Sequence, residues 1–288
     1  MQLQRFNTAQ DFWQNNRVYL AKHEAEHNAM LGIVQTLLQY PERYSEPTYL
    51  AVVRQDQHVL AVAIQTPSDN LMLSRAEDLT ALQLIAQDLE SESLPGVCGL
   101  VAETAAFVQI WQNLTGQPAQ PGPASRIYQL TQVEPVTQVK GSLRLASLAD
   151  WSLLLPWLKD FDAGIGVTDA AETESRLTLH LKRQSLYLWE DGLPVSLVGG
   201  RQFTATAARI APVYTPPEHR GRGYATAGVA ALSQKLLDQG CNRCYLFTDL
   251  ANPTSNHIYQ QVGYRPVCDW RDYLFNSPKS SSSPKPIV

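Results

Sequence analysis

The sequence Arg220-Gly221-Arg222-Gly223-Tyr224-Ala225 links an apolar segment directly to an amphipathic one. The apolar segment, Ala207–Thr215, is typical of a β-strand and is followed by two prolines, which end strands. The next segment, Tyr224–Gln239, has apolar residues at helical spacing and is followed by Gly240, a common helix stop. The pattern therefore predicts a strand, a glycine loop and a helix in immediate succession.

This glycine loop has the features of a binding site for a pyrophosphate or a similar anion. Glycines leave backbone N–H groups uncovered, and the first turn of a helix adds unpaired donors and partial positive charge. Arg220 and Arg222 add two full charges. Two familiar phosphate motifs do not fit. A Walker loop needs a lysine that is absent here, and a dinucleotide fingerprint needs a third glycine where this chain has Thr226.

The loop does match the pattern Arg/Gln-x-x-Gly-x-Gly/Ala, and so resembles the coenzyme A pyrophosphate loop of the GNAT superfamily of N-acetyltransferases. A second segment, from Asn252 to Tyr264, resembles another motif of that family, in which an asparagine precedes a tyrosine and a final Gly-Tyr or Gly-Phe. The two motifs occur in the expected order, joined by a helix and then a strand. The resemblance covers residues 141–275, and the first half of the chain shares only the order of elements.

The resemblance implies an N-acyltransferase that uses acetyl-CoA as the acyl donor and no metal. An acceptor amine would attack the thioester directly, and Tyr259 would be the general acid that protonates the departing thiolate. The residues expected to contact coenzyme A are Val213, Tyr214, Thr215, Arg220, Gly221, Arg222, Gly223, Tyr224, Ala225, Thr226, Asn252, Asn256 and Tyr259.

Elementary chemistry agrees with this assignment. A phenol with a pKa near ~10 can supply a proton as negative charge develops on sulfur. The acceptor amine must also lose a proton, and the sequence leaves this base open among Glu218, Asp249, Asp162 and Glu174. Acidic residues at Asp162, Glu172 and Glu174 could favour a cationic amine, although a charged surface is the simpler interpretation.

The rest of the chain predicts an α/β fold with a mixed, largely antiparallel twisted sheet flanked by helices, GNAT-like and in two tandem domains. The candidate strands and helices of the first half recur in the same order in the second half, about 140 residues later. A loop with Pro118, Pro121 and Pro123 is expected to approach the linker. We expect a degenerate acetyltransferase-like domain at residues 1–130, a linker at 131–140, a catalytic domain at 141–276 and a disordered tail at 277–288.

The first half has a different sequence where the glycine loop would be expected. The corresponding segment, Leu73-Ser74-Arg75-Ala76-Glu77-Asp78, has no glycine and carries two acids that would repel phosphate. We therefore expect the N-terminal domain to bind no coenzyme, and instead to shape the acceptor site or a dimer contact.

Two other functions compete with acyl transfer. One is a catalytically inactive module that binds or senses acyl-CoA. The other is a zinc metallopeptidase, because His23-Glu24-Ala25-Glu26-His27 matches the pattern His-Glu-x-x-His. The longer three-histidine motif is absent, and a solvated helix is the simpler interpretation of this segment.

The composition limits the partners and the compartment. The chain has 23 basic and 27 acidic residues, which excludes a globally basic nucleic-acid binder. It has no apolar run long enough for a membrane span, no apolar signal core, and four scattered cysteines. We expect a cytoplasmic monomer or homodimer that acts on a small-molecule or peptide amine, without nucleic acid or membrane partners.

Overall fold

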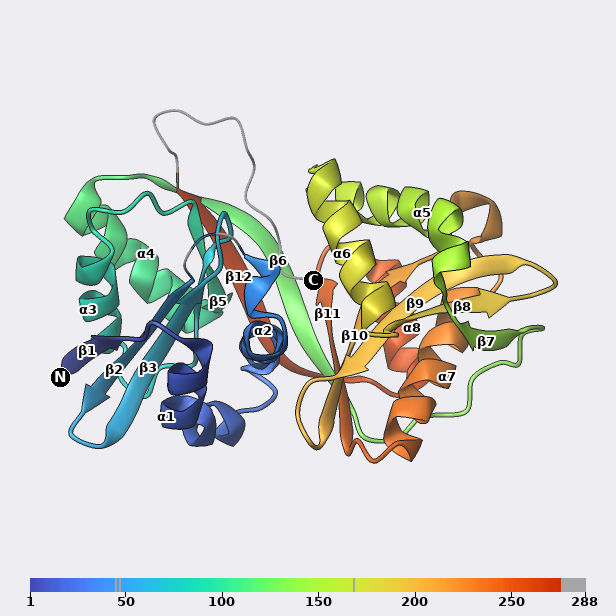
Figure 1. Ribbon diagram of the computed structural model, residues 1–288, viewed down its shortest axis with the longest axis horizontal. Helices are drawn as coiled ribbons and strands as arrows, with labels where there is room; N and C mark the ends of the chain where they lie inside the picture. Colours follow the sequence, from blue (N-terminus) through green and yellow to red (C-terminus); the bar gives the residue numbers. More distant parts are fainter. Residues whose placement is uncertain (45, 47, 168, 276–288) are drawn as a thin grey trace. The chain divides into compact units, whose positions relative to one another are not determined.

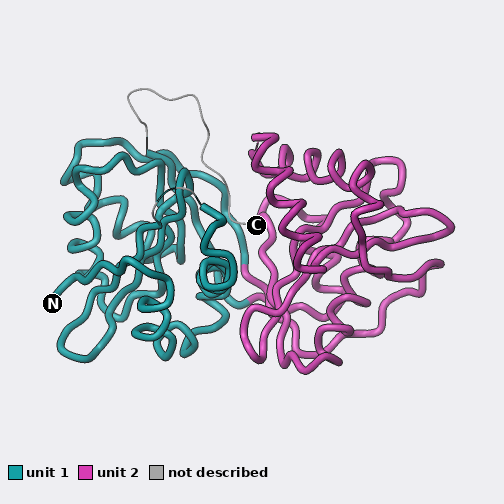
Figure 2. The backbone as a smooth tube through the Cα atoms, viewed as in Figure 1, with its two compact units in different colours: residues 1–126, 267–287 teal, residues 127–266, 288 magenta. Residues whose placement is uncertain are grey.

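The computed structural model describes residues 1–275 except residues 45, 47 and 168, so the predicted disordered tail lies outside the described residues. Contacts within the chain divide it into two compact units (Figure 2). Unit 1 contains residues 1–126 and, of the later described residues, 267–275; unit 2 contains residues 127–266. Residues 267–275 thus belong to unit 1, whereas the sequence pattern assigns them to the C-terminal domain.

Unit 1 is a mixed sheet with helices on its faces (Figure 1). Its elements are β1 (Gln2–Arg5), α1 (Ala9–Lys22), α2 (Asn28–Gln39), β2 (Tyr49–Gln55), β3 (His58–Gln65), β4 (Leu71–Leu73), α3 (Ala81–Asp88), β5 (Gly96–Leu100), α4 (Val101–Thr115), the first part of β6 (Ala119–Leu130) and most of β12 (Arg265–Phe275). The strand order is β1-β2-β3-β4-β5-β12-β6. Only the β4–β5 pair is parallel among the pairs with a defined register in this unit.

Unit 2 repeats the element order of unit 1. Its elements are β7 (Ser142–Leu145), α5 (Trp151–Gly164), α6 (Ala170–Lys182), β8 (Leu186–Glu190), β9 (Pro194–Gln202), β10 (Ala207–Tyr214), α7 (Tyr224–Asp238), β11 (Arg243–Asp249), α8 (Pro253–Val262), the last part of β6 and the start of β12. The strand order is β6-β11-β10-β9-β8-β7, and β10–β11 is parallel. The predicted fold class, a largely antiparallel mixed sheet flanked by helices, is confirmed.

The proline-containing segment before the linker is a strand and not the predicted loop. Pro121 and Pro123 both lie within β6. Strand β6 lies between β12 and β11 in the strand order. Proline has no backbone N–H, so a strand tolerates it only at positions where that group is not needed for pairing. A spacing of two residues turns both ring nitrogens toward the same side.

Two apolar clusters lie on opposite faces of the unit 2 sheet. One cluster packs Val229 of α7 and Val262 of α8 against strand residues that include Ile210. The other packs Leu154 of α5 and Leu177 of α6 against strand residues that include Leu197. Within the described residues, no helix is both long and apolar enough to cross a bilayer.

Candidate functional site

The parallel strands β10 and β11 are paired only at their beginnings. The last paired residues are Arg209 and Tyr245. On its other side β10 stays paired with β9 further along, with Val213 opposite Val198 and Tyr214 opposite Leu197. The edge of β10 that faces β11 therefore has unpaired backbone groups beyond Arg209, and an extended ligand can pair with them.

The glycine loop leads into α7 with backbone amides that remain available. Gly221 and Gly223 have φ angles of 74° and 80°, in the left-handed region that favours glycine. In the described part of the chain, no amide of residues 221–226 donates to an acceptor of the protein. Tyr224, Ala225 and Thr226 form the first turn of α7, where amides lack intrahelical partners. The loop is thus a concave set of donors suited to an anion.

Side-chain contacts fix the end of β10 against this loop. Arg220 Nε donates a hydrogen bond to the carbonyl oxygen of Thr215 at 2.9 Å, and its guanidinium lies 6.0 Å from the centre of the Tyr214 ring. The Tyr214 hydroxyl donates to Asp160 at 2.9 Å. Arg222 is exposed, so its charge is available at the mouth of the loop. Strand end and loop therefore form one continuous surface.

Tyr259 is buried in the cluster formed by α7, α8 and the sheet. Its side chain is 8% exposed, and its ring centre lies 6.1 Å from that of Tyr264. Burial raises the pKa of Tyr259 to about 12. Among the described residues its hydroxyl has no hydrogen-bond partner. The phenol is therefore neutral at physiological pH and keeps a proton that it can donate.

The two predicted asparagines hold the start of α8. Asn252 is its N-cap and accepts a hydrogen bond from the Ser255 amide at 3.0 Å. Asn256 donates to the carbonyl oxygens of Asp249 and Asn252 and accepts from the Tyr128 hydroxyl at 3.1 Å. These bonds position the helix that carries Tyr259, and direct contact of either asparagine with coenzyme A stays a prediction. The sequence pattern gave no indication of Tyr128.

The four candidate bases differ in their surroundings. Asp162 is buried and accepts hydrogen bonds from Arg176 and Thr173, each at 2.6 Å, so its charge is already engaged. Glu174 lies 3.6 Å from Lys159 in an exposed ion pair. Glu218 and Asp249 are both exposed. The Asp249 carboxylate accepts a hydrogen bond from the Ala251 amide at 2.8 Å.

Unit 1 has no comparable set of free amides at the corresponding loop. The Arg75 amide donates to His27 Nε2, and the Ala76 amide donates to Glu103, both at 3.0 Å. The amides at the start of α3 are also engaged, since that of Thr80 donates to the Asp78 side chain at 2.9 Å. Side chains of the protein thus occupy the donors that a pyrophosphate would need.

Unit 1 also lacks a phenol at the position of Tyr259. The helices α4 and α8 both end at a glycine in the left-handed conformation, Gly116 and Gly263. Counting back the same four positions from these glycines gives Tyr259 in unit 2 and Gln112 in unit 1. An amide cannot protonate a thiolate as a general acid.

The second histidine of the zinc-like motif at residues 23–27 is not available as a metal ligand. His27 is buried; its Nδ1 donates to the Leu20 carbonyl at 3.0 Å, and its Nε2 accepts from the Arg75 amide. Burial lowers the pKa of His27 to about 4. Both ring nitrogens are in use, so neither is available to a metal. The motif also spans the break between α1 and α2 instead of one helix, and the described residues contain no group of three suitable ligands.

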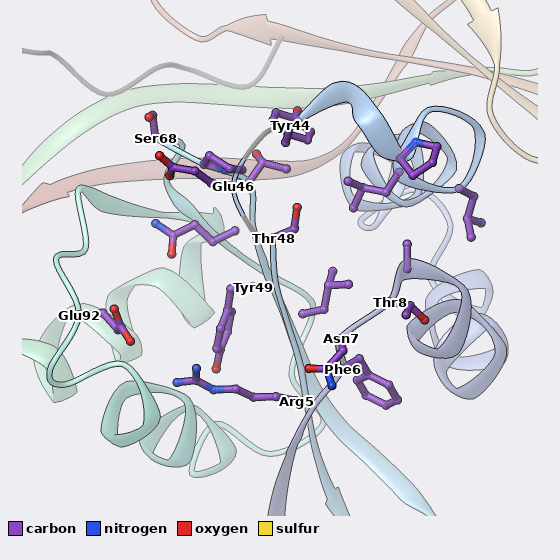
Figure 3. A pocket seen from close by; sticks show the side chains of 18 of the residues that line it. Arg5, Phe6, Asn7, Thr8, Tyr44, Glu46, Thr48, Tyr49, Ser68 and Glu92 are labelled. Carbon is purple, nitrogen blue, oxygen red and sulfur yellow. The ribbon is translucent and has the colours of Figure 1, made fainter.

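A cavity of about 1080 Å³ lies in unit 1, between the ends of β1, β2 and β3 and the start of α1 (Figure 3). The charged groups at this cavity already bind one another, because Arg5 and the Tyr49 hydroxyl each donate a hydrogen bond to Asp88 at 2.7 Å. Glu46 and Glu92 on its wall would oppose an anion. The residues of the 73–78 loop do not line it.

Comparisons with known proteins agree with this geometry. Residues 152–264 match the family model of the acetyltransferase (GNAT) family. No curated protein matches the chain.

Solved structures that resemble the chain share its fold across nearly its full length. A GNAT-family acetyltransferase from Colwellia psychrerythraea has a TM-score of 0.63 at 12% identity, with 96% of this chain and 100% of that chain covered. A Drosophila protein has a TM-score of 0.69 at 12% sequence identity, with 96% of this chain and 99% of that chain covered. A tandem GNAT protein from the clavulanic acid biosynthesis pathway has a TM-score of 0.57 at 12% sequence identity, with 97% of this chain and 99% of that chain covered. The last of these has the same duplicated architecture.

Proposed function

We propose that unit 2, in which residues 152–264 match the family model of the acetyltransferase (GNAT) family, transfers an acetyl group from acetyl-CoA to an amine. The proposal rests mainly on the free amides of residues 221–226, next to the unpaired edge of β10. The amides suit the pyrophosphate of the coenzyme, and the strand edge suits its amide-containing pantetheine arm.

The chemistry needs one proton donor at sulfur. The lone pair of the acceptor nitrogen attacks the thioester carbonyl carbon, the N–C bond forms, and the C–S bond breaks. Sulfur takes the proton of the Tyr259 hydroxyl as it leaves, and solvent returns a proton to the phenolate. The nitrogen of the neutral amine gains a positive charge in the attack and passes one proton to a base or to solvent to become the amide. Burial keeps Tyr259 protonated until this step.

Unit 1 has a supporting role in this proposal. Its loop amides are engaged by His27 and Glu103, and it has Gln112 where unit 2 has Tyr259. We therefore assign one catalytic centre to each chain.

The test is a titration of the full chain with acetyl-CoA, without added metal, followed by assays of thiol release with a panel of amines. Saturable binding with amine-dependent thiol release would support the transferase. Saturable binding without release for any amine would favour an inactive acyl-CoA-binding module. Absence of binding at millimolar acetyl-CoA would contradict the proposal.

A further inference from the structure

A half-buried arginine of β10 has two buried hydrogen-bond donors that the described part of the protein does not satisfy. Arg209 Nε and Nη2 are both buried, and within the described chain neither has a hydrogen-bond partner. The guanidinium carbon lies 4.9 Å from the centre of the Phe247 ring. The aromatic face attracts the positive charge but leaves the in-plane N–H groups without acceptors.

Arg209 lies where β10 and β11 begin to separate. It is the last residue of β10 paired with β11. Its neighbours Ala208 and Ile210 pack in the cluster with α7 and α8. Successive strand residues point to opposite faces, so Arg209 points to the face covered by α5 and α6. Tyr259 packs in the cluster with α7 and α8, so an acceptor bound at Arg209 would lie on the opposite face of the sheet from the general acid.

Other positive charges surround Arg209. Arg201 of β9 is directly opposite it in the strand register, an arrangement that is unfavourable for like charges. Burial, and then the charges of Arg201 and Arg176, lower the pKa of Arg209 to about 10. Burial and nearby arginines also lower the pKa of His180 to about 3. The carboxylate of Asp162 is engaged by Arg176 at 2.6 Å.

The two unsatisfied nitrogens form one edge of the guanidinium, the edge that matches the two oxygens of a carboxylate. The same chain shows this pairing elsewhere. In unit 1, Arg126 Nε and Nη2 donate to the two carboxylate oxygens of Asp269, at 2.6 and 3.1 Å. Arg209 presents the same edge without an acid. Burying an unpaired charge is costly, so its presence indicates a ligand that supplies the acid.

We propose that Arg209 binds a carboxylate of the acceptor, so that the acceptor is an amine that also carries a carboxylate, as amino acids do. This inference rests on the proposed acetyl transfer in unit 2. It assigns Arg209 to substrate binding and leaves Tyr259 as the proton donor.

The test compares two probes on the full chain, with and without saturating coenzyme A. N-acetylglycine carries a carboxylate, and N-acetylglycinamide has the same shape without the charge. We expect calorimetry to show at least about tenfold tighter binding of N-acetylglycine, as for hydrogen bonds to a charged group. Arg209→Gln should remove this preference. Arg265→Gln, which changes an exposed arginine of unit 2 that pairs with Glu134, should keep it.

Equal binding of the two probes by the native chain, no binding of N-acetylglycine at millimolar concentration, or a preference that survives in Arg209→Gln would overturn the inference. A preference for succinyl-CoA over acetyl-CoA that disappears in Arg209→Gln would place the carboxylate on the acyl group and also overturn it. The measurements without coenzyme keep this result separate from a failure of the chain to bind acetyl-CoA.

A ligand-free measurement tests for a purely structural role. Arg209→Met keeps an unbranched side chain similar to the aliphatic part of arginine and removes the unpaired charge. We expect its melting temperature in carboxylate-free buffer to equal or exceed that of the native chain. A lower melting temperature would mean that the protein itself satisfies the guanidinium, and would overturn the inference.

Discussion

Tyr259 combines a buried ring with a hydroxyl that has no protein partner among the described residues, so phenylalanine should fit its place without loss of a hydrogen bond. We expect Tyr259→Phe to lower kcat by about 100-fold, the lower end of the range for general acids, and to change the Kd for acetyl-CoA less than about twofold. Thiol-release kinetics and calorimetry measure the two quantities. A large loss of affinity with unchanged kcat would show that the phenol binds the coenzyme and does not donate the proton.

The raised pKa of Tyr259 also predicts the shape of the pH profile. The acid form is the active one, and a pKa of about 12 keeps it protonated throughout the range in which the protein can be assayed. The rate should therefore rise as the acceptor amine loses its proton and should then stay level to about pH 10. A plot of kcat against pH measures this. An alkaline decline near pH 8 that is absent in Tyr259→Phe would contradict the raised pKa of Tyr259 and not its role as the acid.

Individual residues were predictable where a local pattern defines them and not where strand pairing does. Gly221, Gly223 and Tyr259 belong to short motifs with fixed spacing. The position of Arg209 becomes informative only once β9 places Arg201 opposite it and β11 brings Phe247 beneath it. Strand register is not fixed by composition, so the sequence offered no signal for this site.

At the level of elements, glycines in the left-handed conformation lie beyond both ends of α7, and Gly221 and Gly240 form a matched pair among them. A Cβ added at Gly221 or at Gly240 meets no atom within 4 Å, so alanine at either position brings only backbone strain. We expect Gly221→Ala and Gly240→Ala to lower the melting temperature by similar amounts. Only Gly221→Ala should weaken acetyl-CoA binding, because its new methyl group lies at the loop that donates the amides.

Calorimetry and thermal unfolding on the same preparations give both quantities. Equal affinities in the two variants would remove the loop from the binding site. A loss of affinity in both would point to an effect transmitted through α7 rather than contact with the coenzyme.

The elements themselves were predictable in proportion to their periodicity. The strand β10 and the helix α7 were predicted with nearly their observed bounds. The strand β6 was missed because its prolines are typical of loops. The helices α1 and α2 were missed because their helical pattern is interrupted at residues 23–27.

The duplication of the whole molecule was visible in the order of elements, but its boundary was not. Strands β6 and β12 each contribute residues to both units, with divisions after Arg126 and after Pro266. Trp270 to Leu274 of β12 pair with β5 of unit 1. A single boundary along the sequence cannot describe units that each contain parts of β6 and β12. The pairing of the last strand depends on contacts between residues that are distant in sequence.

A duplicated fold allows two coenzyme sites, and the structure provides reasons to expect one per chain. The amides of residues 221–226 are free in unit 2, whereas those of Arg75 and Ala76 in unit 1 are bonded to His27 and Glu103. A pyrophosphate would have to displace two buried side-chain acceptors and would meet the charge of Glu77. Calorimetric titration of acetyl-CoA into the full chain should therefore fit a single site with a stoichiometry near one. In Gly221→Ala the same single site should weaken, with no second site remaining. A stoichiometry near two, or an unchanged tight site in that variant, would show that unit 1 binds coenzyme as well.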